Sequence, residues 1–160
     1  MSEIENTSPC KIRIAKLDDL QDIYELEQEC FKIPWSLNSI ETDLTSNNNV
    51  ATYLVAVLNE KIVGYIGMWQ ILDEAQVTNL CVSKEFRGRK IASLLIESLI
   101  VFAREHEAIQ LTLEVRQSNS PARTVYERAG FVEICKRNNY YKDNGEDAII
   151  MLKNIPALMN

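Results

Sequence analysis

The chain has 160 residues, of which 46% are hydrophobic and 25% are charged, a length and balance typical of one globular domain. Its formal net charge of −6 argues against a protein that grips a nucleic-acid backbone, because such proteins usually carry a basic face. No segment approaches the roughly 20 apolar residues that cross a bilayer, so we expect a cytoplasmic protein that binds neither nucleic acid nor membrane.

Residues 1–9 are acidic and polar, without the basic start or apolar stretch of a signal peptide. We expect them to form a flexible tail, followed by one domain over residues 10–160. The four cysteines lack metal-site spacing, and the single histidine, His106, lies between two glutamates. We therefore expect no metal and no histidine-dependent nucleophile, and we interpret the cysteines as reduced, mostly buried thiols.

The sequence of the first half of the domain indicates a strand, two helices and three further strands. Alternating residues indicate a strand over 10–15, and helical spacing indicates a helix over 20–31 that Asp18 or Asp19 caps and Pro34 ends. Ser36 is the expected N-cap of a second helix, which reaches the turn at 46–49. Residues 52–58 and 62–71 are predicted to form a hairpin, with another strand over 75–82.

The second half alternates helices and strands. One apolar stripe marks the clearest helix, from about residue 89 to 105, and a strand with apolar Ile109 on its inner face is expected over 109–115. Pro121 near the start and Gly130 past the end bracket a short helix. Closing strands are expected over 131–134 and 147–152. The order βααβββαβαββ predicts one α/β domain around a mixed sheet.

A basic loop with one glycine precedes the long helix. Lys84, Arg87, Arg89 and Lys90 fall within seven residues, around Gly88. A loop at a helix start points several backbone N–H groups at one spot, where the helix dipole adds partial positive charge. A pyrophosphate would fit that spot. A solvated basic turn is the alternative interpretation.

Residues 87–92 resemble motif A of the GCN5-related N-acetyltransferases (GNAT), which reads Arg or Gln, two residues, Gly, one residue, then Gly or Ala. Arg87 opens the pattern and Ala92 closes it, while Lys90 stands where glycine is usual. Because a residue at a helix start needs no positive φ, we expect none at Lys90 and expect Gly88 to absorb the turn. Six further motifs, at residues 33–36, 72–75, 113–116, 126–131, 137–141 and 146–151, are similar to the RimI-like subfamily.

The resemblance spans about residues 12–152 and implies a mixed, mostly antiparallel sheet flanked by helices. It also implies an enzyme that transfers the acetyl group of acetyl-coenzyme A, a cosubstrate, to an amine. RimI-like enzymes acetylate the N-terminal alanine of small-subunit ribosomal protein eighteen, so a ribosomal protein N-terminus is the implied acceptor. An acidic enzyme would attract such a basic tail.

Two residues are implied to be catalytic. Glu114 lies on the polar face of its strand, where an ordinary solvated carboxylate is the alternative, and the resemblance makes it the general base. Tyr126 has the spacing of a core tyrosine, and the resemblance makes it the proton donor to the coenzyme A thiolate.

The resemblance also implies two sets of binding residues. The cofactor would contact the backbone of the strand end, the basic loop and one asparagine: Leu80, Val82, Arg87, Gly88, Arg89, Lys90, Ile91, Ala92 and Asn119. The acceptor would contact aromatic and acidic residues, for some of which core packing is the alternative: Phe31, Pro34, Trp35, Asp73, Glu74, Tyr140 and Tyr141.

Two other functions remain open at this point. The same fold hosts acetyltransferases for other protein N-termini, lysine side chains or small amines. A non-catalytic acyl-coenzyme A sensor or assembly subunit is an alternative of another class, although a pure binder needs neither Glu114 nor Tyr126.

Overall fold

The computed structural model describes residues 9–157. The predicted tail, apart from its last residue, and the end of the predicted domain at residues 158–160 lie outside the described residues. The elements follow the predicted order: β1 (Lys11–Ile14), α1 (Leu20–Cys30), α2 (Leu37–Thr45), β2 (Ala51–Leu58), β3 (Lys61–Ile71), β4 (Glu74–Val82), α3 (Ile91–Glu105), β5 (Gln110–Arg116), α4 (Ser120–Arg128), β6 (Val132–Arg137) and β7 (Ala148–Asn154). Two 3₁₀ turns, Leu17–Asp19 and Lys84–Phe86, complete the set.

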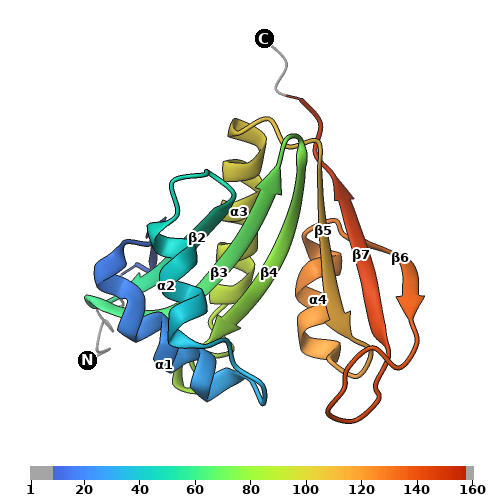
Figure 1. Ribbon diagram of the computed structural model, residues 1–160, viewed down its shortest axis with the longest axis horizontal. Coiled ribbons are helices and arrows are strands. Elements are labelled where there is room, and N and C mark those ends of the chain that lie inside the picture. Colours follow the sequence, from blue (N-terminus) through green and yellow to red (C-terminus); the bar gives the residue numbers. More distant parts are fainter. Residues whose placement is uncertain (1–8, 158–160) are drawn as a thin grey trace, which may run out of the picture.

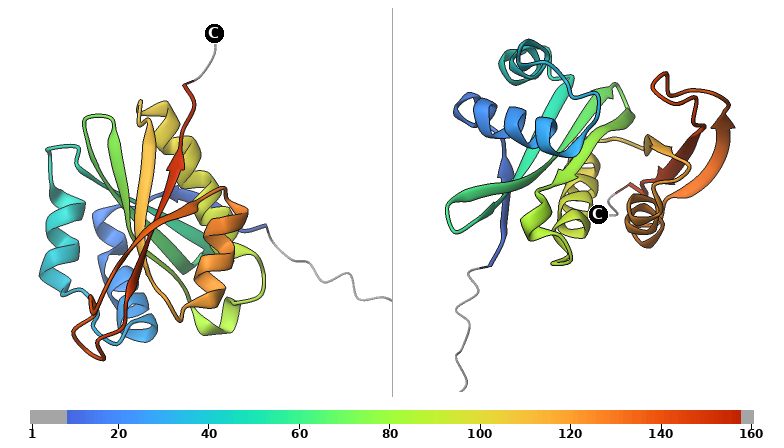
Figure 2. Two further views of the ribbon diagram at one scale, coloured as in Figure 1. Left: turned by 90° about the vertical axis from the view of Figure 1, so that its right-hand side faces the viewer. Right: turned by 90° about the horizontal axis from the view of Figure 1, so that it is seen from below.

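One seven-stranded sheet, in the order β1-β2-β3-β4-β5-β7-β6, forms the centre of the domain. Every neighbouring pair is antiparallel except β4 and β5, which are parallel. Helices α1 and α2 lie on one face of the sheet, and α3 and α4 lie on the other (Figures 1 and 2). The mixed, mostly antiparallel sheet is therefore confirmed.

Each face of the sheet buries its own apolar core. The larger core packs α3 and α4 against the sheet and includes Leu95, Leu99, Leu113 and Phe131. The smaller core lies under α1 and α2 and includes Ile23, Ile40 and Tyr65. This division follows the strand alternation, which sends successive side chains to opposite faces.

Local signals in the sequence place the helix ends correctly. The hydroxyl oxygen of Ser36 accepts a hydrogen bond from the Ser39 amide at 3.1 Å, as expected of an N-cap. Asp19 is the N-cap residue of α1, but its carboxylate binds Arg13 instead of the helix amides. Gly130 follows α4 with a φ of 98°, a conformation that favours glycine.

Two expectations about burial are wrong. Ile109 precedes β5 and is 54% exposed. It lies at the rim of the sheet, where its amide donates to the Asp73 carbonyl and its carbonyl accepts from the Ile155 amide. Only one of the four cysteines, Cys81, is buried. Cys135 is exposed because it lies on β6, the edge strand.

Candidate active site

The site forms where β4 and β5 separate. The two strands pair only from Glu74 and Gln110 to Gln76 and Thr112, and they diverge toward their carboxyl ends (Figure 1). A β-bulge shifts the register of β4 against β3 between Gly67 and Met68, which bends β4 away from its parallel neighbour. The backbone of β4 beyond Gln76 therefore has no strand partner on the β5 side.

This unpaired edge presents the backbone of Leu80 and Val82. The amide of Ser83 donates to Val63 on β3 at 2.8 Å, so by strand alternation the peptide groups of Leu80 and Val82 face the gap. The Val82 carbonyl accepts from Arg87 Nε at 3.1 Å instead of from a strand. The cofactor residues implied on β4 therefore have main-chain groups available at the site.

The basic loop after β4 has free amides at the start of α3. Lys90 is the N-cap residue, and no side chain caps the helix. The first helical bond runs from the Leu94 amide to the Lys90 carbonyl, so the amides of residues 91–93 have no acceptor within the helix. Ile91 is buried in the core and can offer only its backbone, whereas Ala92 is half-buried.

The backbone of this loop differs from expectation. Lys90 adopts a left-handed conformation with a φ of 62°, and Gly88 also has a positive φ, of 80°. The expectation that Lys90 needs no positive φ is therefore wrong, since the chain must turn twice to direct three amides toward one point. Successive amides in such a bend form a cradle for an anion, and Gly88, Arg89 and Lys90 are exposed around it. These groups fit a pyrophosphate.

Glu114 lies on β5 opposite Ile150 of β7 and points to the face that α3 does not cover. Its side chain is 22% exposed, and its carboxylate oxygen Oε1 lies 3.4 Å from Arg137 Nη1 on β6. Tyr140 is close enough that a hydrogen bond to Glu114 raises the pKa of its phenol. The carboxylate is therefore held at the surface by a cation and a phenol.

Tyr126 lies on α4 and belongs to the core on the other face of the sheet from Glu114. It is buried against Phe131, with the ring centroids 5.8 Å apart in an edge-on arrangement. Burial raises the pKa of Tyr126, and the nearby Tyr141 and Cys81 raise it further. Glu114 likewise raises the pKa of Tyr141, which burial brings to about 12, so Tyr141 lies within electrostatic range of both implied catalytic residues.

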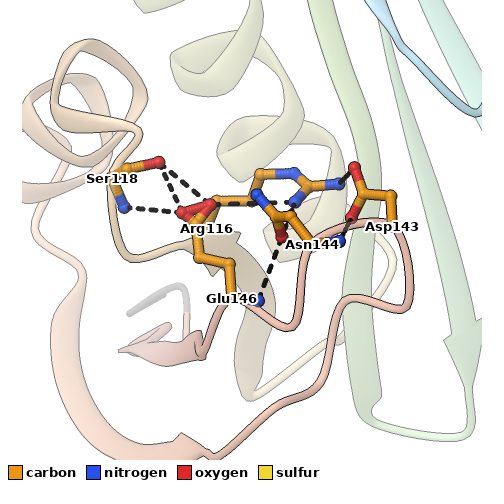
Figure 3. Close-up of polar contacts among 5 residues, drawn as sticks. All are labelled: Arg116, Ser118, Asp143, Asn144 and Glu146. Carbon is orange, nitrogen blue, oxygen red and sulfur yellow. Dashed lines mark hydrogen bonds and ion pairs between the residues drawn. The ribbon is translucent and has the colours of Figure 1, made fainter.

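A network of polar contacts fixes the loop that carries Tyr140 and Tyr141 (Figure 3). Arg116, at the end of β5, binds Asp143 at 3.0 Å, and its guanidinium lies 3.9 Å from the centre of the Tyr141 ring. Glu146 accepts a hydrogen bond from the Ser118 hydroxyl at 2.9 Å. The loop between β6 and β7 is thereby attached to the end of β5, next to Glu114.

The loop between α1 and α2 carries the implied acceptor residues Phe31, Pro34 and Trp35 and is called the acceptor loop; a buried carboxylate, Glu27, attaches it to the sheet. The Trp35 amide donates to Glu27 Oε2 at 3.0 Å, and the other oxygen accepts from Tyr65 on β3 and Asn79 on β4. Phe31 and Pro34 are half-buried beside this contact. No sequence pattern indicates Glu27 or Asn79, because only the fold brings a carboxylate of α1 to the residue that precedes Leu80.

Three of the implied site residues have other positions or contacts. Asp73 directly precedes β4 and Glu74 is its first residue, whereas Leu80 and Val82 lie near its other end, roughly 20–27 Å from Glu74 at about 3.3 Å per residue. The role of Asp73 and Glu74 toward the acceptor stays a prediction. Asn119 is the N-cap of α4 and accepts from the Ala122 amide at 3.3 Å, which leaves its side-chain NH₂ for other contacts.

Comparisons with known proteins agree with this geometry. The chain matches the Acetyltransferase (GNAT) family over residues 20–131. It is 39% identical over 140 residues to a Bacillus subtilis (strain 168) protein provisionally named [ribosomal protein bS18]-alanine N-acetyltransferase, covering 88% of this chain and 92% of that protein. In structure it is similar to the ribosomal-protein-S18-alanine N-acetyltransferase from Escherichia coli, with a TM-score of 0.85, 30% identity, and coverage of 95% and 97% of the two chains.

A more distant neighbour shares the fold. The PaiA N-acetyltransferase from Thermoplasma acidophilum, solved in complex with coenzyme A, has a TM-score of 0.77 at 19% identity and covers 92% of this chain and 99% of its own. The family match covers more than half of the sequence, and the relatives align over nearly all of it. This chain belongs to the GNAT family of acetyltransferases.

Proposed function

We propose that this enzyme transfers the acetyl group of acetyl-coenzyme A to the N-terminal alanine of ribosomal protein bS18. The observation that carries the proposal is the unpaired edge of β4 where it diverges from β5, the strand of Glu114, next to the uncapped start of α3. The names of the relatives support the acceptor. The net charge of −6 favours a basic polypeptide over an acidic one.

When bound, acetyl-coenzyme A supplies the acetyl thioester. The amides at the start of α3, with Arg89 and Lys90, would hold its pyrophosphate. The outward-facing peptide groups of Leu80 and Val82 would hold the pantetheine arm and polarise the thioester carbonyl.

Glu114 accepts the proton of the attacking amine. The pKa of a free α-amino group is about 8, so roughly a tenth to a fifth is neutral near pH 7, and a positioned base is worth about 10²- to 10⁴-fold in rate. Tyr126 donates to the departing thiolate. Because burial raises its pKa, the phenol stays protonated and must donate through a short hydrogen bond as charge develops on sulfur.

Replacement of the two residues tests the mechanism. Glu114→Gln is expected to lower kcat by about 10²-fold or more with little change in coenzyme A affinity, and Tyr126→Phe is expected to slow the chemical step. Glu133→Gln on β6 is the matched control, because this exposed carboxylate pairs with Arg123 outside the site. Full turnover in Glu114→Gln would remove it as the base.

A charge reversal tests the loop. Arg87→Glu combined with Lys90→Glu is expected to weaken coenzyme A binding in calorimetry. The control, Arg128→Glu with Lys136→Glu, makes the same change in net charge at exposed positions on α4 and β6. Unchanged affinity in the loop variant would mean that the pyrophosphate binds elsewhere.

The acceptor is tested in cells and in vitro. Mass spectrometry of ribosomal proteins from cells that lack this enzyme should show bS18 with an unmodified N-terminal alanine. In vitro, a peptide that begins with alanine should outcompete a polyamine, a lysine side chain and other N-termini. A polyamine that outcompetes the peptide would contradict the proposal.

A further inference from the structure

A cavity of about 410 Å³ opens beside the acceptor loop. It lies between α2 and β3 and is lined by Trp35, Asn38, Ser39, Thr42, Asp43 and Trp69. The ring centroids of Trp35 and Trp69 are 5.7 Å apart and the rings are inclined at 43°, so the two indoles pack against each other in the wall of the cavity. Trp69 is 40% exposed, although a large aromatic side chain on a sheet is usually covered. The cavity is aromatic on one side and polar on the other.

The polar side of the cavity carries one negative charge. The Oδ2 atom of Asp43 accepts from the Tyr53 hydroxyl at 2.7 Å and from Trp69 Nε1 at 3.2 Å. Within residues 9–157 the other oxygen, Oδ1, accepts no hydrogen bond, and no ion pair includes Asp43. None of the lining residues is a cation. A carboxylate with a free oxygen beside two indole rings suits a cation, because indole is the best aromatic partner for a cation.

The cavity opens on the same face of the sheet as Glu114. Trp69 pairs with Gln76 across β3 and β4, and Gln76 pairs with Thr112 across β4 and β5. Thr112 lies two residues before Glu114, and β5 sends Leu111, Leu113 and Val115 to the opposite face, into the core with α3. Gln76 is exposed and Thr112 is half-buried, so a polar surface connects the cavity to the implied base.

The length of this surface sets the position of the cation in the acceptor. Two strand spacings of about 4.8 Å and two residues along β5 place the Cα atoms of Trp69 and Glu114 about 12 Å apart. An extended polypeptide advances about 3.3 Å per residue, so this distance corresponds to between three and four residues.

We propose that the cavity of Trp35, Trp69 and Asp43 is a subsite for a lysine or arginine side chain at about the third or fourth position of the acceptor polypeptide. This inference rests on the proposed function, which brings a polypeptide N-terminus to Glu114. It also gives the charge of a basic acceptor a further partner near the site, in addition to the predicted Asp73 and Glu74. The chemistry of recognition is cation–π contact with the indoles and an ion pair with Asp43.

The test uses peptides of seven residues that begin with alanine and are otherwise uncharged, with one arginine placed at each of positions 2 to 6. We expect kcat/KM to be about tenfold higher with arginine at position 3 or 4 than with glutamine there, mainly through KM. In Asp43→Asn this ratio should fall to about threefold or less. Asparagine keeps an acceptor for Tyr53 and Trp69, so the helix should stay in place. Asn38→Asp, which adds a charge to the same wall, should raise the ratio.

Binding without catalysis provides a second measurement. Trp35 and Trp69 are the only tryptophans of the chain, so tryptophan fluorescence, excited selectively over the six tyrosines, reports on this cavity. Titration with the arginine peptide should change the fluorescence of the wild type, and Asp43→Asn should weaken that binding several-fold. Equal ratios in the wild type and Asp43→Asn, or no fluorescence response, would overturn the subsite while activity on alanine peptides leaves the proposed function intact. Inactivity on every peptide, together with arginine-dependent fluorescence, would overturn the proposed function and retain the subsite.

Discussion

The buried carboxylate of Glu27 is predicted to be essential for stability. Its side chain is fully buried and accepts hydrogen bonds from three elements: the Trp35 amide, Tyr65 on β3 and Asn79 on β4. In Glu27→Ala the Trp35 amide and the Tyr65 hydroxyl lose their acceptor, whereas the Asn79 NH₂ keeps the Tyr65 hydroxyl at 2.9 Å, and each buried unpaired group costs about 1–3 kcal/mol. We expect a loss of about 2–6 kcal/mol in the free energy of unfolding, the sum for two unpaired donors. This is a large part of the roughly 5–15 kcal/mol that stabilises a typical domain.

Urea denaturation followed by far-ultraviolet circular dichroism measures this loss. Glu27→Gln should cost less, about 1–3 kcal/mol, because its NH₂ group must face either the Trp35 amide or the Asn79 amide, and only one donor is displaced. Glu25→Ala is the matched control on the same helix, at an exposed position, and should change stability by no more than about 0.5 kcal/mol. A loss below about 1 kcal/mol in Glu27→Ala would refute the reasoning, since it would mean that water or neighbouring groups replace the carboxylate at little cost.

Three further predictions concern single side chains. Lys90→Gly should raise the free energy of unfolding by about 1 kcal/mol and Tm by about 2–4 °C, because glycine removes the strain of a left-handed backbone; an unchanged Tm in calorimetry would contradict this. Hydrogen bonding from Arg13 lowers the pKa of Asp19 from its ordinary 3.8, so the pair stabilises the fold above that pH and loses its effect as pH falls through the lowered pKa. Asp19→Asn should therefore be less stable than the wild type in urea at pH 7, and the difference should shrink below about pH 4. A hydrogen bond from Cys81 lowers the pKa of Cys30 to about 7, so alkylation of Cys30, mapped by mass spectrometry, should have a midpoint near pH 7; a midpoint near the ordinary 9.0 would show that the thiol is unperturbed.

The local structure of this protein could be read from short stretches of residues. Ser36 caps α2 because its hydroxyl reaches an amide only three residues away. Gly130 ends α4 because a positive φ suits glycine, a property of one residue. The alternation along β5 indicated that Glu114 points away from the apolar core, and its neighbours on the strand are indeed buried there. Signals of this kind act over one helical turn or one strand, so the order of elements was predictable.

The composition of the site depended on contacts between distant segments. Glu27 and Asn79 are 52 residues apart, and Gln76 and Thr112 are 36 apart; the register that joins them follows from the packing of two cores and from a bulge in β4. That register places Trp69, Gln76 and Thr112 in one row across the sheet, next to the cavity that Asp43 lines. Lys90 shows the same limit at short range, since the need to aim three amides at one point outweighed the backbone preference of lysine. Periodicity and capping act between near neighbours and therefore fixed the elements, whereas the energy of burying whole faces of the sheet decided which side chains meet.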